Sequence, residues 1–235
     1  MKSTRRVILA AMLALVAGAA AAAQGQAPQA PPPGPAYVLT YLEFGPSTVN
    51  NAIAAMKTYR DASRREMGAR TVDIYQEAGH PHRFVLREIW DDRPAYDRHA
   101  MAASASQFTA AVRPIHFGPI YISVHVEYWM SPVKQGGAND AFVITHVDVG
   151  GNNVPRLKEM LDKLGPASAN DAGLARYEIL DEVPAHPNHF SFFEQWTSEA
   201  NWAAHHSSPH ARAFRDSVTP ILGTPYDQRL YRLVN

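Results

Sequence analysis

The sequence of 235 residues contains no cysteine. This absence excludes disulfide bonds, thiol nucleophiles, iron–sulfur clusters and zinc sites with cysteine ligands. The sequence also has no Gly-rich phosphate-binding loop and no Gly-x-Ser-x-Gly nucleophile elbow, so nucleotide-dependent and serine-hydrolase functions have no support. The fold must therefore be stabilised by its hydrophobic core and not by covalent cross-links.

An excess of positive charge is also missing. The chain has 22 basic and 22 acidic residues, and the basic residues do not cluster in one segment. Proteins that bind nucleic acid or an anionic membrane surface usually carry such a cluster. We therefore expect no nucleic-acid partner and no membrane partner.

The apolar run near the N-terminus is shorter than the stretch of about 20 residues that spans a bilayer. Residues 1–6 are basic, residues 7–16 are apolar, and small residues follow up to Ala23. This order is typical of a cleaved secretory signal. We predict a signal peptide at residues 1–23 and a mature protein, beginning near Gln24, that is periplasmic or secreted.

Two export routes remain open for this signal. Arg5 and Arg6 precede the apolar run, which fits a twin-arginine signal as well as an ordinary Sec signal. Removal of both arginines together with Lys2 leaves the mature chain with three fewer basic than acidic residues.

What the sequence does contain is one unit in two copies. Residues 37–44 align with residues 142–149, and the same offset, with one residue inserted, continues to the end of the chain. Glu88, Trp90, Tyr96, His99 and Phe108 align with Glu194, Trp196, Trp202, His205 and Phe214. The period is longer than the 20–50 residues of stacked repeats, so each copy should be a small domain.

The composition places the boundaries of these domains. A Pro/Ala/Gln-rich segment precedes the first copy and should be an extended tether, and a polar Gly-Gly segment between the copies should be a linker. The expected organisation is a signal peptide (1–23), a tether (24–36), a first domain (37–130), a linker (131–140) and a second domain (141–235).

Each copy shows the same order of expected elements. In the first copy we predict strands at 37–44, 70–77, 84–90 and 120–129, with helices at 47–67, 94–99 and 104–112. In the second copy we predict strands at 142–149, 176–182, 190–196 and 226–233, with helices at 155–164, 199–206 and 209–221. This β-α-β-β-α-β order predicts an α+β protein made of two tandem ferredoxin-like domains.

The third strand of the first copy indicates how the domains pair. Phe84, Leu86 and Trp90 face one side of the sheet while Val85 and Ile89 face the other, so both sides carry apolar side chains. A sheet with two apolar faces should be covered on both. We therefore expect the two sheets to pair within the chain into a dimeric α/β-barrel-like pseudo-dimer, with formation of a homodimer left open.

At the end of the third strand, an acidic residue stands two positions before Trp90, an aromatic residue six positions after it, and His99 nine positions after it. This motif resembles the antibiotic biosynthesis monooxygenase (ABM) family, in a tandem two-domain form of the dimeric α/β-barrel superfamily. The second copy repeats this spacing around Trp196 and adds Ser-Pro-His at residues 208–210. The resemblance covers residues 37–235 and is closer in the second copy.

This resemblance implies oxidation of a small phenolic, quinol or anthrone-type aromatic substrate by O₂, with no metal, flavin or other cofactor. Deprotonation of such a substrate gives an electron-rich anion that can pass an electron to O₂, so the protein supplies a base and a dry apolar pocket. The implied catalytic residues are His99, His205 and Tyr96. The implied substrate-binding residues are Trp90, Trp196, Trp202, Glu88 and Glu194.

Structural roles for these residues remain alternatives. The tryptophans could be core residues, the histidines could brace the ends of helices through the helix dipole, and the glutamates could form structural hydrogen bonds. A binding or stress-response module that uses the same cavity without turnover is the second functional class. It would show a cavity without an ionisable group facing its interior.

Two further functions are not expected. Five histidines fall between residues 186 and 210, but no two have dependable i, i+4 spacing and no carboxylate completes an evident zinc triad, so we predict no metal site. Heme-degrading relatives use an asparagine on the first strand. This sequence instead has Thr40, Tyr41, Thr145 and His146 there, which argues against heme degradation.

Overall fold

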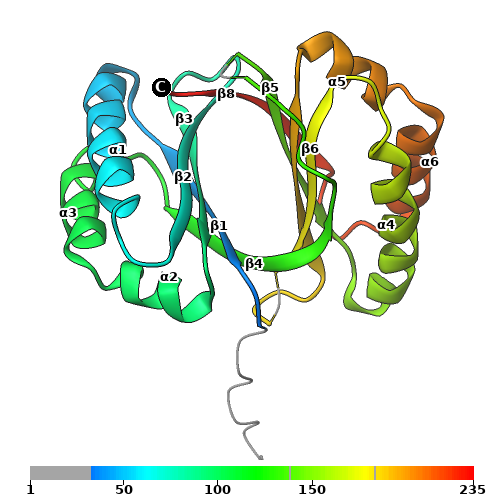
Figure 1. The fold of residues 1–235 in the computed structure, drawn as a ribbon, viewed down its shortest axis with the longest axis horizontal. Helices are drawn as coiled ribbons and strands as arrows, with labels where there is room; N and C mark the ends of the chain where they lie inside the picture. The colour runs from blue at the N-terminus through cyan, green and yellow to red at the C-terminus, as the bar shows by residue number, and fades with distance from the viewer. Residues whose placement is uncertain (1–32, 138, 183) are drawn as a thin grey trace, which may run out of the picture. The chain divides into compact units, whose positions relative to one another are not determined.

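The computed structural model describes residues 33–137, 139–182 and 184–235 (Figure 1). The expected signal peptide and most of the expected tether lie outside these residues. No helix in the described part of the chain is both long enough and apolar enough to cross a membrane.

Both halves have the predicted β-α-β-β-α-β order. The first half consists of β1 (Ala36–Glu43), α1 (Val49–Ser63), β2 (Ala69–Glu77), β3 (Arg83–Trp90), α2 (Arg93–Ala100), α3 (Ala103–Val112) and β4 (Tyr121–Met130). The second half consists of β5 (Ala141–Asp148), α4 (Val154–Ser168), β6 (Leu174–Asp181), β7 (His189–Trp196), α5 (Glu199–His206), α6 (Pro209–Val218) and β8 (Asp227–Leu233). Short 3₁₀ turns lie at Pro46–Thr48, Gly151–Asn153 and Thr219–Ile221.

The strands of the two halves close into one antiparallel barrel in the order β1-β3-β2-β8-β5-β7-β6-β4. The halves meet along two seams, because β8 pairs with β2 and β4 pairs with β6. The last strand of each half thus joins its own sheet to the other one. This arrangement confirms the predicted intrachain pairing of two ferredoxin-like sheets.

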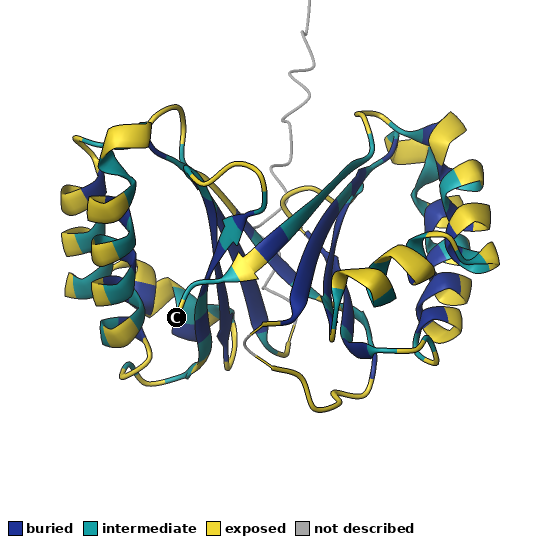
Figure 2. Cartoon of the chain, turned by 90° about the horizontal axis from the view of Figure 1, so that it is seen from above, coloured by how far each residue is buried: buried dark blue, intermediate teal, exposed yellow. Residues whose placement is uncertain are grey.

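The barrel has an inner and an outer apolar layer. Helices α1 to α3 cover the outside of one sheet and α4 to α6 cover the outside of the other, while the strands between them are mostly buried (Figures 1 and 2). On β3, Phe84 and Leu86 pack in the helix-side cluster, whereas Val85 packs with Leu39 and Phe193 in the interior of the barrel. The alternation predicted for this strand is therefore confirmed.

Two helix ends differ from the prediction. Helix α1 ends at Ser63, before the predicted residue 67, and Gly68 then turns the chain with a φ of 93° that other residues rarely adopt. Helix α4 continues to Ser168 and includes Pro166 in its last turn. Gly165 does not end this helix, since its role is close packing: a Cβ atom there would lie 2.5 Å from the ring of Trp129.

The predicted linker is partly an extension of the sheet. Ser131 donates its backbone N–H to the carbonyl oxygen of Tyr177 at 2.8 Å, and its hydroxyl accepts from the N–H of Tyr177 at 2.8 Å. The backbone N–H of Lys134 donates to Ala175 at 2.9 Å. The first residues of the linker are thereby held along β6.

Candidate functional site

A cavity of about 270 Å³ lies in the first half, between the helix-facing side of the sheet and helices α1, α2 and α3. Its size is near the lower limit of about 300 Å³ for small-molecule pockets. It is lined by Thr40, Tyr59, Leu86, Glu88, Tyr96, His99, Ala100, Ala105, Phe108, Thr109, Ile120 and Ile122. The wall is mostly apolar, with ionisable groups on one side.

Local structure places the ionisable groups at this cavity. Residue alternation on β3 turns Leu86 and Glu88 toward the helices. Asp92 caps the N-terminus of helix α2, because its side chain accepts a hydrogen bond from the backbone N–H of Ala95 at 2.7 Å. Tyr96 and His99 are three residues apart on this helix and therefore share one face, with ring centroids 6.3 Å apart.

The central feature of the site is the hydroxyl of Tyr59, on α1. It lies 2.6 Å from Glu88 Oε1 and 2.7 Å from His99 Nε2. The other ring nitrogen of His99, Nδ1, lies 2.9 Å from Glu66 Oε2. The hydroxyl of Ser104 donates to the second oxygen of Glu66. These contacts form a continuous chain from Glu88 through Tyr59 and His99 to Glu66, which we call the proton relay.

The hydrogen bonds of the proton relay determine how many protons its four side chains share. A carboxylate only accepts hydrogen bonds, so the contact with Glu66 requires a proton on His99 Nδ1. Tyr59 has one proton and can donate it to Glu88 or to His99 Nε2, but not to both. Both short contacts are made only when one extra proton lies on Glu88 or on His99. The relay can therefore take up one proton and release it.

Burial controls the acidity of two members of the relay. Glu88 is 1% exposed, and burial raises the pKa of its carboxyl. Burial, together with the negative charge of nearby Glu88, also raises the pKa of Tyr59, so this hydroxyl transmits a proton without ionising itself. Burial raises the pKa of Tyr96 to about 12.

Trp90 supports the relay from behind the cavity wall. Its side chain is fully buried, its indole N–H donates to Glu88 Oε2 at 2.8 Å, and its ring stacks on His99 with centroids 4.3 Å apart. The structure therefore does not bring Trp90 to the cavity surface as a substrate contact. It holds the two ionisable groups in place.

The second half repeats the contacts that tryptophan and the acidic residues make in the first half, but it lacks the hydroxyl that connects glutamate to histidine. Trp196 donates to Glu194 Oε2 at 2.8 Å and stacks on His205 with centroids 4.7 Å apart. His205 Nδ1 lies 2.6 Å from Asp171 Oδ2. However, Leu164 occupies the position of Tyr59, and His205 Nε2 lies 4.0 Å from Glu194 Oε2. No hydroxyl from this helix position connects the two groups.

Five of the twelve positions that line the first cavity carry larger side chains in the second half. Leu86, Tyr96, Ala100, Thr109 and Ile120 correspond to Phe192, Trp202, His206, Arg215 and Tyr226. Trp202 and Tyr226 pack against the hydrophobic core cluster of the second half. The sequence motif led us to expect the better-preserved site in the second half, whereas the cavity described above and the complete relay lie in the first.

Sequence reasoning missed two members of the relay. Tyr59 has the spacing of a core residue on its helix, and Glu66, which the sequence placed within the predicted helix 47–67, lies in the turn after α1. The repeat itself carried a signal for Glu66, because Asp171 is its equivalent and both are acidic. Nothing in the sequence marked Tyr59.

Solved structures with the same fold are described as monooxygenases. A predicted monooxygenase from Fusobacterium nucleatum superposes with a TM-score of 0.75 and 14% identity, covering 86% of this chain and 94% of that one. A predicted monooxygenase from Lactobacillus acidophilus superposes with a TM-score of 0.67 and 15% identity, covering 86% of this chain and 93% of that one. An anthrone oxidase-like protein superposes with a TM-score of 0.69 and 17% identity, covering 86% of this chain and 92% of that one. At these identities the likeness shows the fold alone.

The family is shown by the sequence. No curated protein matches the chain. The model of the antibiotic biosynthesis monooxygenase family matches residues 35–112 and again residues 141–217, which together are more than half of the chain. Each matched segment lies in one half of the barrel and ends before the last strand of that half, β4 or β8. The chain therefore belongs to the antibiotic biosynthesis monooxygenase family, as a tandem two-domain member.

Proposed function

We propose that the first half is a cofactor-independent monooxygenase site that acts with O₂ on a small phenolic, quinol or anthrone-type substrate. The observation that carries this proposal is the proton relay at the wall of the cavity of about 270 Å³. A binding module needs an apolar cavity but has no need for a buried group that takes up a proton. Membership of the family and likeness to an anthrone oxidase-like protein support the same reaction class.

The relay supplies the base. A substrate hydroxyl or acidic C–H in the cavity gives its proton to the relay at His99 Nε2, beside the hydroxyl of Tyr59. Tyr59 then donates to Glu88, and the contact with Glu66 stabilises the positive charge on the imidazole. The substrate becomes an anion in a site that excludes water.

The anion is the reductant for O₂. One oxygen atom of O₂ enters the substrate as a carbonyl and the other leaves as water with two hydrogens lost by the substrate. The substrate therefore supplies all four electrons that reduce O₂, and no external reductant is needed. Apolar side chains such as Leu86, Phe108 and Ile122 enclose the aromatic body of the substrate. Tyr96, which keeps its proton, can donate a hydrogen bond to the oxygen that becomes negatively charged.

Oxygen uptake and isotope incorporation test this function together. The protein, treated with a chelator and free of flavin absorbance, is supplied with a panel of quinols and anthrones under ¹⁸O₂. We expect oxygen consumption with at least one substrate and one labelled oxygen atom per product molecule. Tight binding of the same compounds without oxygen consumption would instead establish the alternative, a non-catalytic binding or stress-response module.

We also propose that the protein acts after export. The basic start, the short apolar run and the small residues up to Ala23 support a cleaved signal. N-terminal sequencing of the protein from its native host should give a first residue near Gln24. Recovery of a soluble cytoplasmic form that retains Met1 would contradict the proposal.

A further inference from the structure

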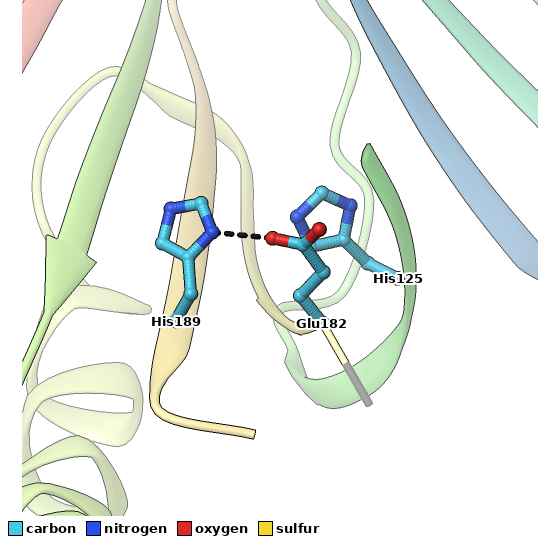
Figure 3. Close-up of side chains that lie close together, drawn as sticks. All are labelled: His125, Glu182 and His189. Carbon is cyan, nitrogen blue, oxygen red and sulfur yellow. Dashed lines mark hydrogen bonds and ion pairs between the residues drawn. The ribbon is translucent and has the colours of Figure 1, made fainter. Parts of the chain in front are cut away.

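A second group of ionisable side chains lies away from the proposed catalytic cavity, at the junction of the two halves. His125 is on β4, Glu182 directly follows β6, and His189 begins β7. One ligand atom from each residue lies within 4.8 Å of the others, and the Glu182 carboxylate lies between the two imidazoles (Figure 3). These residues are separated by up to 64 positions in the chain, so only the closed barrel brings them together.

Glu182 is a buried carboxylate whose ion-pair partners are imidazoles. It is 2% exposed. Its oxygens contact His189 Nδ1 and, at 2.9 Å, His186 Nδ1, and the hydroxyl of Tyr121 lies 3.5 Å away. Among the residues that the structure describes, no lysine or arginine forms an ion pair with Glu182. A buried carboxylate without a fixed cation is costly unless a bound cation or another proton compensates its charge.

The first half provides an internal reference for this carboxylate. Glu77 is the equivalent of Glu182 and also contacts a histidine, with His80 Nδ1 at 2.7 Å. Glu77 has two arginine partners, with nitrogen–oxygen distances of 3.5 Å to Arg229 and 4.0 Å to Arg83. At the carboxylate of the first half, the protein itself therefore supplies the positive charge.

Two substitutions distinguish the second half from this reference. His189 occupies the position of Arg83, and His125 occupies the position of Tyr231. The strand register supports the second equivalence, because His125 pairs with the first strand of its half in the way that Tyr231 pairs with β5. Around the same carboxylate, a cation and a phenol are thus replaced by two potential metal ligands.

The surroundings of the imidazoles fit metal ligation. His125 Nδ1 lies 3.4 Å from the carbonyl oxygen of Tyr37, a contact that leaves Nε2 as the ligand atom, with the hydroxyl of Ser191 at 3.0 Å. His189 uses Nδ1 toward Glu182, and its Nε2 lies 3.1 Å from His146 Nδ1. Metal-bound histidines typically make such a hydrogen bond through the second ring nitrogen.

A route from solvent reaches this cluster. A cavity of about 320 Å³ is lined by Tyr41, Tyr121, His146, His189, Asp227 and Arg229. It meets the cluster at His189, the one of the three ligands that lines it, and at Tyr121, whose hydroxyl lies 3.5 Å from Glu182. Space on this side would also leave a coordination position for water.

We propose that His125, Glu182 and His189 form a binding site for one divalent transition-metal ion, of which Zn²⁺ is the best match. Two imidazoles and one carboxylate are an established ligand set for Zn²⁺ and for other first-row ions. The site requires strands from both halves, since His125 comes from the first and the other ligands come from the second. The proposal is independent of the proposed oxygenase function, because the relay and this cluster share no residue.

The sequence did not predict this site. The five neighbouring histidines gave no dependable spacing, and His125 lies 57 positions before Glu182. A second group, Asp171 with His205 and His210, meets the same distance criterion. There, a single oxygen of Asp171 contacts both rings, at 2.6 and 3.0 Å, and the equivalent Glu66 makes the same contact with His99. The acidic residue at this position therefore orients a histidine in both halves. Asp171 thus serves as a control residue for the metal-binding experiment.

Metal binding to the full chain tests the proposal directly. Chelator-treated protein is dialysed against Zn²⁺ or Co²⁺ and its metal content is measured by elemental analysis, with the visible spectrum of Co²⁺ as a second readout. We expect one tightly bound ion per chain. Glu182→Gln should weaken binding by roughly 100-fold or more, because loss of a ligand should exceed the 10–100-fold effect of losing an outer partner. Glu77→Gln and Asp171→Asn should bind as the unmodified protein does.

The variant His189→Arg separates metal binding from folding. It places beside Glu182 the arginine that the first half has at the equivalent position, Arg83. The variant should therefore keep the melting temperature of the metal-free protein, but it should no longer bind the ion. Absence of a bound ion in the unmodified protein would overturn the proposal. Equal binding by His189→Arg, or loss of the ion in Asp171→Asn alone, would overturn it as well.

Discussion

The two halves of the barrel have the same order of elements and nearly the same hydrogen bonds at the end of the third strand, but they differ in one bridging residue. In the first half, Tyr59 connects Glu88 to His99. In the second half, Leu164 stands at this position, so no hydroxyl from this helix position bridges Glu194 and His205, which face each other at 4.0 Å. The shared contacts, such as tryptophan to glutamate, are therefore part of the fold, and the connection is an added feature of one half.

The cavity follows the same division. Smaller side chains keep it open in the first half, while Phe192, Trp202 and Tyr226 occupy equivalent positions in the second. A filled core supplies dispersion contacts that an open cavity lacks. Under the proposed function, this comparison assigns the chemistry to the first half and a stabilising role to the second.

The sharpest test of this division is to remove one histidine at a time. His99→Ala should lower oxygen consumption by roughly 10²–10⁴-fold, because the relay loses the group that takes up the proton. His205→Ala is the matched control and should leave the rate near that of the unmodified protein. Both are measured by oxygen uptake with the most active substrate. Equal losses, or a loss in His205→Ala alone, would reverse the assignment of the halves.

The unbridged glutamate of the second half should make stability depend on pH. Burial raises the pKa of Glu194 to about 7, against about 4.3 in an unfolded chain. Between these values the folded protein binds more protons than the unfolded chain, so the free energy of unfolding falls as pH rises, by roughly 3–4 kcal/mol in total.

Glu194→Gln should remove this dependence. In urea denaturation, the variant should gain stability relative to the unmodified protein between about pH 5 and about pH 7.5, because an amide does not ionise. The matched variant Glu88→Gln tests the bridged glutamate of the first half. A difference for Glu194→Gln that is the same at both pH values would show that this carboxyl is not the group that titrates.

Removal of the bridging hydroxyl should affect both activity and stability. Tyr59→Phe keeps the ring, which stacks on Phe108 with centroids 4.5 Å apart, but leaves the Oε1 atom of Glu88 without its donor. We expect turnover to fall about 10-fold or more and the free energy of unfolding to fall by roughly 1.5–3 kcal/mol. Leu164→Met is the control in the second half, with unchanged turnover and a cost below about 1.5 kcal/mol. Unchanged turnover in Tyr59→Phe would show that the relay is structural.

Exchange of one cavity residue between the halves should have the smallest effect. Leu86→Phe brings the side chain of the second half into the first cavity and should lower kcat/KM by about 10-fold, because substrate and ring compete for space. Phe192→Leu is the reverse change and should cost roughly 1 kcal/mol in stability without altering the rate. Steady-state kinetics and thermal denaturation measure the two effects. An unaffected kcat/KM in Leu86→Phe would place the substrate elsewhere.

Much of the fold could be predicted because it rests on periodic patterns. Alternation on β3 gave the two faces of the sheet, and the repeat gave the pairing of the halves. The end of α4 could not be predicted, since Gly165 and Pro166 normally end a helix. Here the packing of Trp129 against Gly165 outweighs that local tendency.

The site was only partly predictable. The spacing from Trp90 placed Glu88, Tyr96 and His99 near one another, as the structure shows. Tyr59 could not be found, because a tyrosine on the apolar side of a helix has the pattern of a core residue until its hydroxyl partner is known. Contacts between distant segments, which also create the cluster around Glu182, depend on barrel closure and leave no local pattern.

The linker that runs along β6 has a consequence for how such differences can arise. A homodimer built from single-repeat subunits is bound by its twofold axis, so any substitution appears on both sides of the barrel. Here the residues after Met130 pair with Tyr177 and Ala175 and join both sides in one chain. Each substitution is then made once, and Arg83 and His189 can occupy matching places with different chemistry. Covalent fusion thus releases the barrel from symmetry while keeping its architecture.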